Sequence, residues 1–71
     1  MAEGLKISLK ACRVNANLRQ TDVALAMKVD KSTVSSWERG ITHPSIPQAQ
    51  RLSDLFGIPL DNIIFLPQKL A

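Results

Sequence analysis

The residues best suited to chemistry lie in one stretch, QTDVALAMKVDKSTVSSWERG, residues 20–40 of the chain. On a helical wheel at about 100° per residue, Val34 and Trp37 fall together on one side of residues 31–39. The opposite side has hydrogen-bond donors and two cations but no carboxylate: Lys31, Ser32, Ser35, Ser36 and Arg39. Such a helix suits the major groove of DNA, which is wide enough to admit one. A solvated helix face, which would ordinarily include Asp or Glu, is the alternative, and this face alone does not decide between the two.

The other reactive side chains do not form a catalytic or metal-binding set. Cys12 and His43 are the only thiol and the only imidazole, whereas a zinc site needs about four ligands. Cys12 falls on an apolar stripe and is expected to be buried, and His43 is expected in a loop. No nucleophile with its base, carboxylate pair or phosphate-binding glycine loop is present, so we expect no enzyme activity and no cofactor. Trp37 could stack on single-stranded bases, but its position beside Val34 favours the core.

Length and composition indicate one small globular domain. The chain has 71 residues, of which 45% are hydrophobic, and a net charge of +3. This charge favours a polyanionic partner only weakly. No apolar run reaches the roughly eighteen residues that span a bilayer, so no membrane is expected. A single cysteine cannot form an internal disulfide, which fits a reducing cytoplasmic or nuclear setting, and we expect the cytoplasm.

We expect a single domain over residues 1–71, with its core over residues 5–65. Residues 66–71 are interpreted as a tail that is either frayed or part of a dimer contact. The contact is favoured because Phe65, Leu66 and Leu70 would otherwise be exposed.

Five short helices and no strand fit the hydrophobic pattern, which predicts an all-α fold. The expected helices span residues 5–15, 20–27, 31–39, 46–56 and 60–65. Asn17 suits a left-handed residue after the first helix, and Asp30 suits the N-cap of the third. Gly40 suits the end of the third helix, and SIPQ, beginning at Ser45, has the form of a capping box. Leu55 is expected in the core.

The order of these signals closely resembles the helix-turn-helix of the phage Cro and CI-type repressors, the bacterial XRE-like family. The shared pattern runs from Gln20 through Ala24 and Val34 to WERG (37–40), HPSI (43–46) and LFGIPLDNII (55–64). It covers most of the chain. The resemblance implies a compact five-helix, lambda-repressor-like domain that binds a double-stranded DNA operator as a homodimer. It also implies regulation of transcription, by repression, with two half-sites about one helical turn apart.

The resemblance assigns roles to individual positions. Gln20 corresponds to a residue that contacts the DNA backbone and orients the first recognition side chain. The family positions that face base edges are matched here by Lys31, Ser32 and Ser36, and Ser35 is their neighbour. Residues expected near phosphate or orienting the contact are Arg19, Gln20, Thr21, Arg39, Thr42 and His43. Arg13 and Glu38 correspond to an internal ion pair that ties the first helix to the third.

Three positions depart from the family pattern. Lys28 replaces a turn glycine that tends toward positive φ. Arg19 replaces a Ser or Thr cap, and Leu25 occupies a normally polar outer position. Two alternatives to a repressor remain: the antitoxin of a toxin–antitoxin pair that represses its own operon, and a protein-interaction module on the same fold. Carboxylates on the recognition helix would mark the latter, and residues 31–36 contain none.

Overall fold

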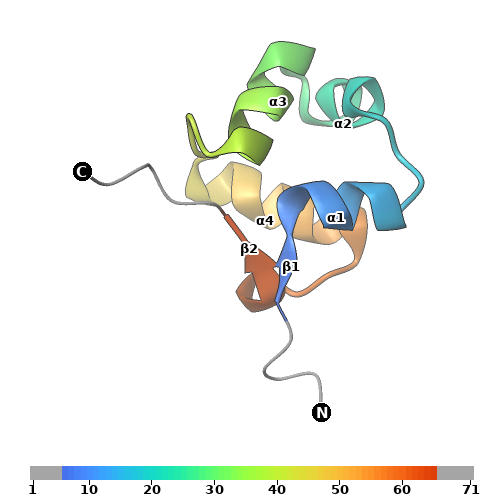
Figure 1. Ribbon diagram of the computed structural model, residues 1–71, viewed down its shortest axis with the longest axis vertical. Helices are drawn as coiled ribbons and strands as arrows, with labels where there is room; N and C mark the ends of the chain where they lie inside the picture. Colours follow the sequence, from blue (N-terminus) through green and yellow to red (C-terminus); the bar gives the residue numbers. More distant parts are fainter. Residues whose placement is uncertain (1–5, 66–71) are drawn as a thin grey trace.

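The computed structural model describes residues 6–65 as a mostly helical fold. Its elements in chain order are β1 (Ile7–Ser8), α1 (Leu9–Asn15), α2 (Gln20–Met27), α3 (Lys31–Arg39), α4 (Ile46–Phe56), the 3-10 turn η2 (Leu60–Asn62) and β2 (Ile63–Ile64). α2 and α3 form one end of the molecule and the two strands lie toward the other, with α1 and α4 between them (Figure 1). The predicted helix-turn-helix architecture is confirmed.

The first and last expected helices are wrong in their bounds. The first begins at Leu9, where the Ser8 hydroxyl caps it by accepting from the Ala11 N–H at 3.1 Å. Residues 60–65 form one 3-10 turn and then a strand, in place of a fifth α-helix. Ile7 pairs with Ile63 and Ser8 with Ile64 in a parallel register. β-branched side chains favour this extended backbone, but the pairing joins distant parts of the chain and leaves no local pattern. Residues 5 and 66–71 lie outside the described part.

The core gathers side chains from all four α-helices and β2. Its buried members are Leu9, Cys12, Val23, Ala24, Met27, Val34, Trp37, Leu52 and Ile63. Burial of Cys12 and of Trp37, which is 4% exposed, is confirmed. Leu55 was predicted to be buried and is 36% exposed, whereas Ala49 and Leu52 of the same helix are buried.

The helix ends follow the predicted local signals. Asn17 has φ +60°, and Gly40 ends α3 with φ +77°. Ser45 and Gln48 form the capping box of α4, with the Gln48 N–H donating to the Ser45 hydroxyl at 3.2 Å. The Ser45 N–H donates to the Gln48 side-chain oxygen at 2.8 Å. These residues mark the end of α1, the end of α3 and the start of α4.

Candidate nucleic-acid interface

A tight turn joins α2 to α3 and fixes the angle between them. Lys28 ends α2 in the left-handed conformation, with φ +60° and ψ +44°. The Val29 N–H donates to the Ala24 carbonyl at 3.0 Å, and the Val29 side chain packs against the core. Asp30 is extended and starts α3. A lysine in this conformation costs about 1 kcal/mol or more relative to glycine, so the turn keeps the family geometry at some strain.

α3 has one buried side and one outward side. Val34 and Trp37 are buried against the core. Lys31, Ser32 and Arg39 are exposed, whereas the candidate residues Ser35 and Ser36 are half-buried. The structure therefore brings the candidate base-reading residues onto one helix, with the first turn of α3 the most accessible part.

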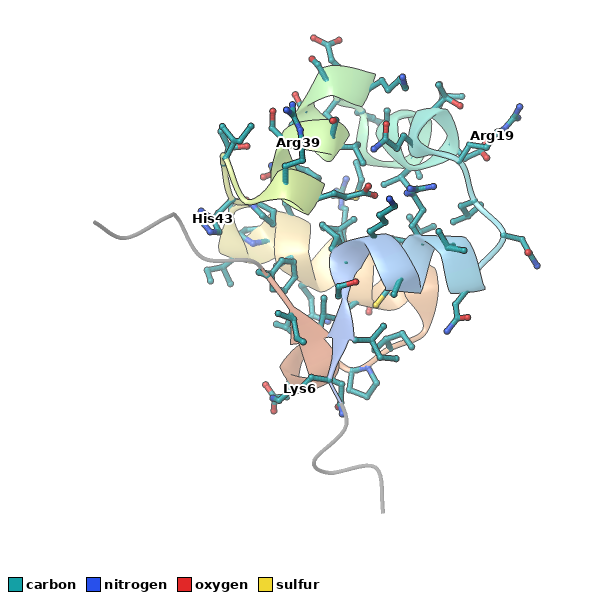
Figure 2. All side chains as sticks on the ribbon, in the orientation of Figure 1. Lys6, Arg19, Arg39 and His43 are labelled. Atoms are coloured by element: carbon teal, nitrogen blue, oxygen red, sulfur yellow. The ribbon has the colours of Figure 1, made fainter. Side chains whose placement is uncertain are left out.

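Other candidate DNA contacts flank α2 and α3. Figure 2 shows Arg19 beside α2 and Arg39 beside α3, at the end of the molecule away from Lys6. Thr21, Thr42 and His43 are exposed. Donors from the start of α2, the end of α3 and the following loop are therefore accessible at the surface.

Asp30 adds a negative charge that the sequence interpretation did not place at this surface. Its backbone provides the N-cap of α3, as predicted, but its side chain makes no capping hydrogen bond. The carboxylate is exposed directly before Lys31. Leu25, at 79% exposed, is the apolar departure on α2.

Behind the outward side of α3 lies a buried polar cluster of Arg13, Gln20 and Glu38. Arg13 Nε donates to Glu38 Oε2 at 2.6 Å, and Arg13 Nη2 donates to Oε1 at 3.3 Å. The two side chains are 12% and 4% exposed. Gln20 Nε2 also donates to Glu38 Oε1, at 3.0 Å. The ion pair is the one that the family pattern indicates; the Gln20 contact was missed, because nothing in the sequence shows that residues 20 and 38 meet.

The start of α2 compensates for its unusual cap. Arg19 supplies no side-chain acceptor, but its backbone N–H donates to Asp22 Oδ2 at 2.8 Å. Arg19 Nε lies 3.3 Å from the same oxygen. The backbone hydrogen bond, followed by the side-chain hydrogen bond, lowers the pKa of Asp22 below its ordinary value of 3.8. One carboxylate therefore serves both the helix end and the Arg19 guanidinium.

The described residues contain no other chemical site of a recognised kind. Within residues 6–65 no group of three His, Cys, Asp or Glu side chains could hold a metal ion. In that same range no helix has the length and apolar character to cross a membrane. Burial raises the pKa of the Cys12 thiol, so this thiol stays protonated and suits a core position.

Two short helices joined by a tight turn, with the second exposed along one side, define a helix-turn-helix unit. A helix-turn-helix family model matches residues 9–63, and the chain belongs to this family. Its helix-turn-helix is of the Cro/CI-type, XRE-like class that occurs in transcriptional regulators.

Two relatives agree with this assignment. The chain is 32% identical over 59 residues to an uncharacterized HTH-type transcriptional regulator of Methanocaldococcus jannaschii, covering 83% of this chain and 89% of that protein. It is 27% identical over 56 residues to the cryptic phage CTXphi transcriptional repressor RstR of Vibrio cholerae. That match covers 79% of this chain and 50% of the repressor, so the alignment spans half of the repressor's length. No solved structure matches the chain significantly.

Proposed function

We propose that this protein binds double-stranded DNA as a homodimer at an operator and represses transcription. The observation that carries the proposal is the first turn of α3. Lys31 and Ser32 are exposed there, directly in front of the buried Val34. Residues 31–36 contain no carboxylate, so phosphates on either side of the groove would not be repelled by that part of the helix.

Base reading is assigned to Lys31, Ser32 and Ser36, with Ser35 beside them. Lysine donates well to the O6 and N7 acceptors of guanine, and serine can donate to or accept from several base edges. Short side chains allow the helix to lie close to the floor of the groove. Ser35 and Ser36 are half-buried, so they would contact base edges only if α3 lies close to the floor of the major groove.

Phosphate contacts are assigned to the start of α2 and the end of α3. The first backbone N–H groups of a helix have no partner within it and suit an anion, which gives Gln20 and Thr21 their role. Arg19, Arg39, Thr42 and His43 are exposed around the same surface. Repression is supported by the name of the phage relative. The protein bound at its operator would exclude polymerase, and it would act in the cytoplasm of a bacterial or phage-infected cell.

A homodimer is supported by an apolar hollow next to the loop that follows α3. Its volume is about 270 Å³, and it is lined by His43, Pro44, Ile46, Ala49, Leu60 and Phe65. Ile46 is 77% exposed at the start of α4. None of the lining residues carries a permanent charge, which suits contact between two copies of a chain with net charge +3. Phe65 was expected at the dimer contact.

The DNA proposal is tested by selecting bound sequences from a random pool and then titrating variants against the enriched site. Lys31→Ala, Ser32→Ala and Ser36→Ala should each lower affinity by about 1–3 kcal/mol and relax preference at one or two base pairs. Gln20→Ala should lower the affinity for all DNA sequences by a similar factor. Arg19→Ala should flatten the slope of log affinity against log salt by about one unit.

The matched control is Lys6→Ala, because Lys6 lies at the opposite end of the molecule (Figure 2). It should leave base preference unchanged. If all three α3 variants kept the original preferences, α3 would not be the reading element. A symmetric enriched site would support the dimer, and a single asymmetric half-site would oppose it.

The dimer surface is tested by Ile46→Gln in sedimentation experiments over a range of protein concentrations. Since Ile46 is exposed in the single chain, the substitution should leave the melting temperature of the monomer unchanged while weakening dimerisation. Leu25→Gln, another exposed apolar side chain on α2, serves as the control and should leave dimerisation intact. An unchanged dimer in Ile46→Gln would exclude the hollow as the contact.

A further inference from the structure

The Gln20 side chain is bound by the carboxylate of Glu38, which is almost closed to solvent. Gln20 is the first residue of α2 and is half-buried. Its Nε2 donates to Glu38 Oε1 at 3.0 Å, and the Glu38 side chain is only 4% exposed. Glu38 belongs to the last turn of α3, so this contact joins the start of one helix to the end of the next.

The chemistry of Glu38 fixes which way the Gln20 amide points. An ionised carboxylate only accepts hydrogen bonds, whereas a glutamine amide has an accepting oxygen and a donating nitrogen. The nitrogen must therefore face Glu38, since the reversed amide would place two acceptors against each other. Nε2 has two protons, and Glu38 takes one. Because the amide group is planar, this contact also restricts the direction of the second N–H.

The position of Glu38 is in turn fixed by Arg13. The guanidinium binds both carboxylate oxygens, at 2.6 and 3.3 Å. Its third contact is to the Leu18 carbonyl, at 3.0 Å, in the segment that leads into α2. No buried side-chain nitrogen or oxygen among residues 6–65 lacks a partner. Glu38 is thus held in place by a cation that is itself anchored to α1 and to the backbone before Gln20.

We propose that Glu38 is a positioning residue for DNA binding. It does not touch DNA; it holds the Gln20 amide so that the second Nε2 proton meets a phosphate oxygen at the start of α2. This rests on the proposed function of the α2–α3 surface. A glutamine side chain left to rotate would lose conformational freedom on binding, and Glu38 removes that cost in advance. The buried ion pair therefore acts on DNA affinity as well as on folding.

The test is a thermodynamic cycle on DNA affinity. The pair is replaced as a whole, Arg13→Met with Glu38→Met, because apolar side chains of similar size often replace a buried ion pair without loss of stability. This pair replacement is measured with and without Gln20→Ala, on the selected operator and at a temperature where every variant is folded. The control background is Gln50→Ala. Gln50 is also a glutamine that donates to a carboxylate, that of Asp54 at 3.4 Å, but this contact lies on the exposed side of α4.

The pair replacement should lower affinity by about five- to tenfold when Gln20 is present, as expected for one hydrogen bond lost from a prepared donor. In the Gln20→Ala background its effect should fall below about twofold, and in the Gln50→Ala background it should remain five- to tenfold. An equal loss with and without Gln20 would overturn the inference and leave only a structural role. Failure of the parent protein to bind any DNA would instead remove the proposed function, and the inference with it.

A second measurement requires no substitution of the pair. In the parent protein, NMR should resolve two Gln20 side-chain amide protons, of which the one bound by Glu38 exchanges with water more slowly than the side-chain amide protons of Gln50. Addition of operator should shift one of the two and leave the other protected by Glu38. Gln20 protons that exchange as fast as those of Gln50, or lose protection in the complex, would contradict the inference.

Discussion

An arginine–carboxylate ion pair occurs both on the buried side of α3 and at the exposed start of α2, and the two pairs differ in their exposure to solvent. At α3, Arg13 and Glu38 form an ion pair that is almost closed to solvent, beside the buried Trp37. At the start of α2, Arg19 and Asp22 form a second Arg–carboxylate pair, in which the Arg19 side chain is 83% exposed. At the other end of α2, Lys28 takes an unfavourable backbone conformation in the open.

Exposure decides how much each of these features contributes to stability. Water and salt screen an exposed ion pair, whose typical contribution is about 0–1 kcal/mol. Removing one partner of a buried pair leaves a lone charge in a poor solvent, at about 3–5 kcal/mol. The buried Arg13–Glu38 pair should therefore contribute more to stability than the exposed Arg19–Asp22 pair at the start of α2. Substitutions in the two pairs should differ accordingly.

The largest effect is expected from Trp37→Ala, which removes the main apolar anchor of α3. Truncation of a buried tryptophan costs about 3–5 kcal/mol, comparable with the whole stability of a small domain. Thermal melts should show an unfolded or barely folded protein. Trp37→Phe, which keeps much of the apolar volume, should lose less. A near-native melting temperature for Trp37→Ala combined with lost DNA affinity would mean that the ring faces outward.

Arg13→Ala and Glu38→Ala should each lower the free energy of unfolding by about 3 kcal/mol, because each leaves the other charge buried alone. The double variant should lose less than the sum of the two. Denaturant titrations of the three variants give this coupling. Arg19→Ala is the exposed counterpart and should change stability by less than about 1 kcal/mol. Additive losses for Arg13 and Glu38 would show that the pair does not act as a unit.

Lys28→Gly should raise the free energy of unfolding by about 0.5–1 kcal/mol. Glycine accepts positive φ without strain, which outweighs the extra freedom that it gives the unfolded chain. Asn17→Gly is the matched control, because Asn17 also has φ +60° but asparagine tolerates this conformation well. Asn17→Gly should therefore raise the free energy of unfolding by less than Lys28→Gly does. Equal gains at both positions, measured by denaturant titration, would argue against strain at Lys28.

The smallest effect is expected from Asp22→Asn, and it should depend on pH. The folded-state pKa of Asp22 is lower than the ordinary value of 3.8, so its carboxylate stabilises the fold above that pH. This contribution disappears as the pH falls through the folded-state pKa. Asp22→Asn should therefore be less stable than the parent at neutral pH and similar to it in strong acid. The measurement is the melting temperature of both proteins from neutral to acidic pH. If Asp22 did not contribute in this way, the difference between the two melting temperatures would stay constant over that range.

Much of the fold follows from local sequence signals. α2 and α3 have the predicted bounds, and the capping box at Ser45 lies where the pattern placed it. These features depend on residues within a few positions of one another. The pairing of Ile7 with Ile63 does not. An apolar run of two or three residues fits a helical turn and a short strand equally well, so residues 60–65 were assigned to a helix.

The candidate site was predictable to a similar degree. Periodicity was sufficient to place Lys31 and Ser32 outward and Trp37 inward. It could not show that Ser36 would be half-buried, because that depends on how deeply α3 sits against its neighbours. The Gln20–Glu38 hydrogen bond depends on the angle between two helices. The Asp30 side chain was expected to cap α3, but it makes no capping hydrogen bond.

The parallel pair of Ile7 and Ile63 also has a kinetic consequence. It joins the two ends of the described chain and so closes nearly all of it into one loop, whereas α2 and α3 are neighbours across a short turn. Contacts between neighbours form quickly, and closing a long loop requires a larger entropy loss before any contact is gained. The helix-turn-helix is therefore expected to assemble early and the strands to join last. Unfolding would begin where the strands part, at the end of the molecule farthest from α3.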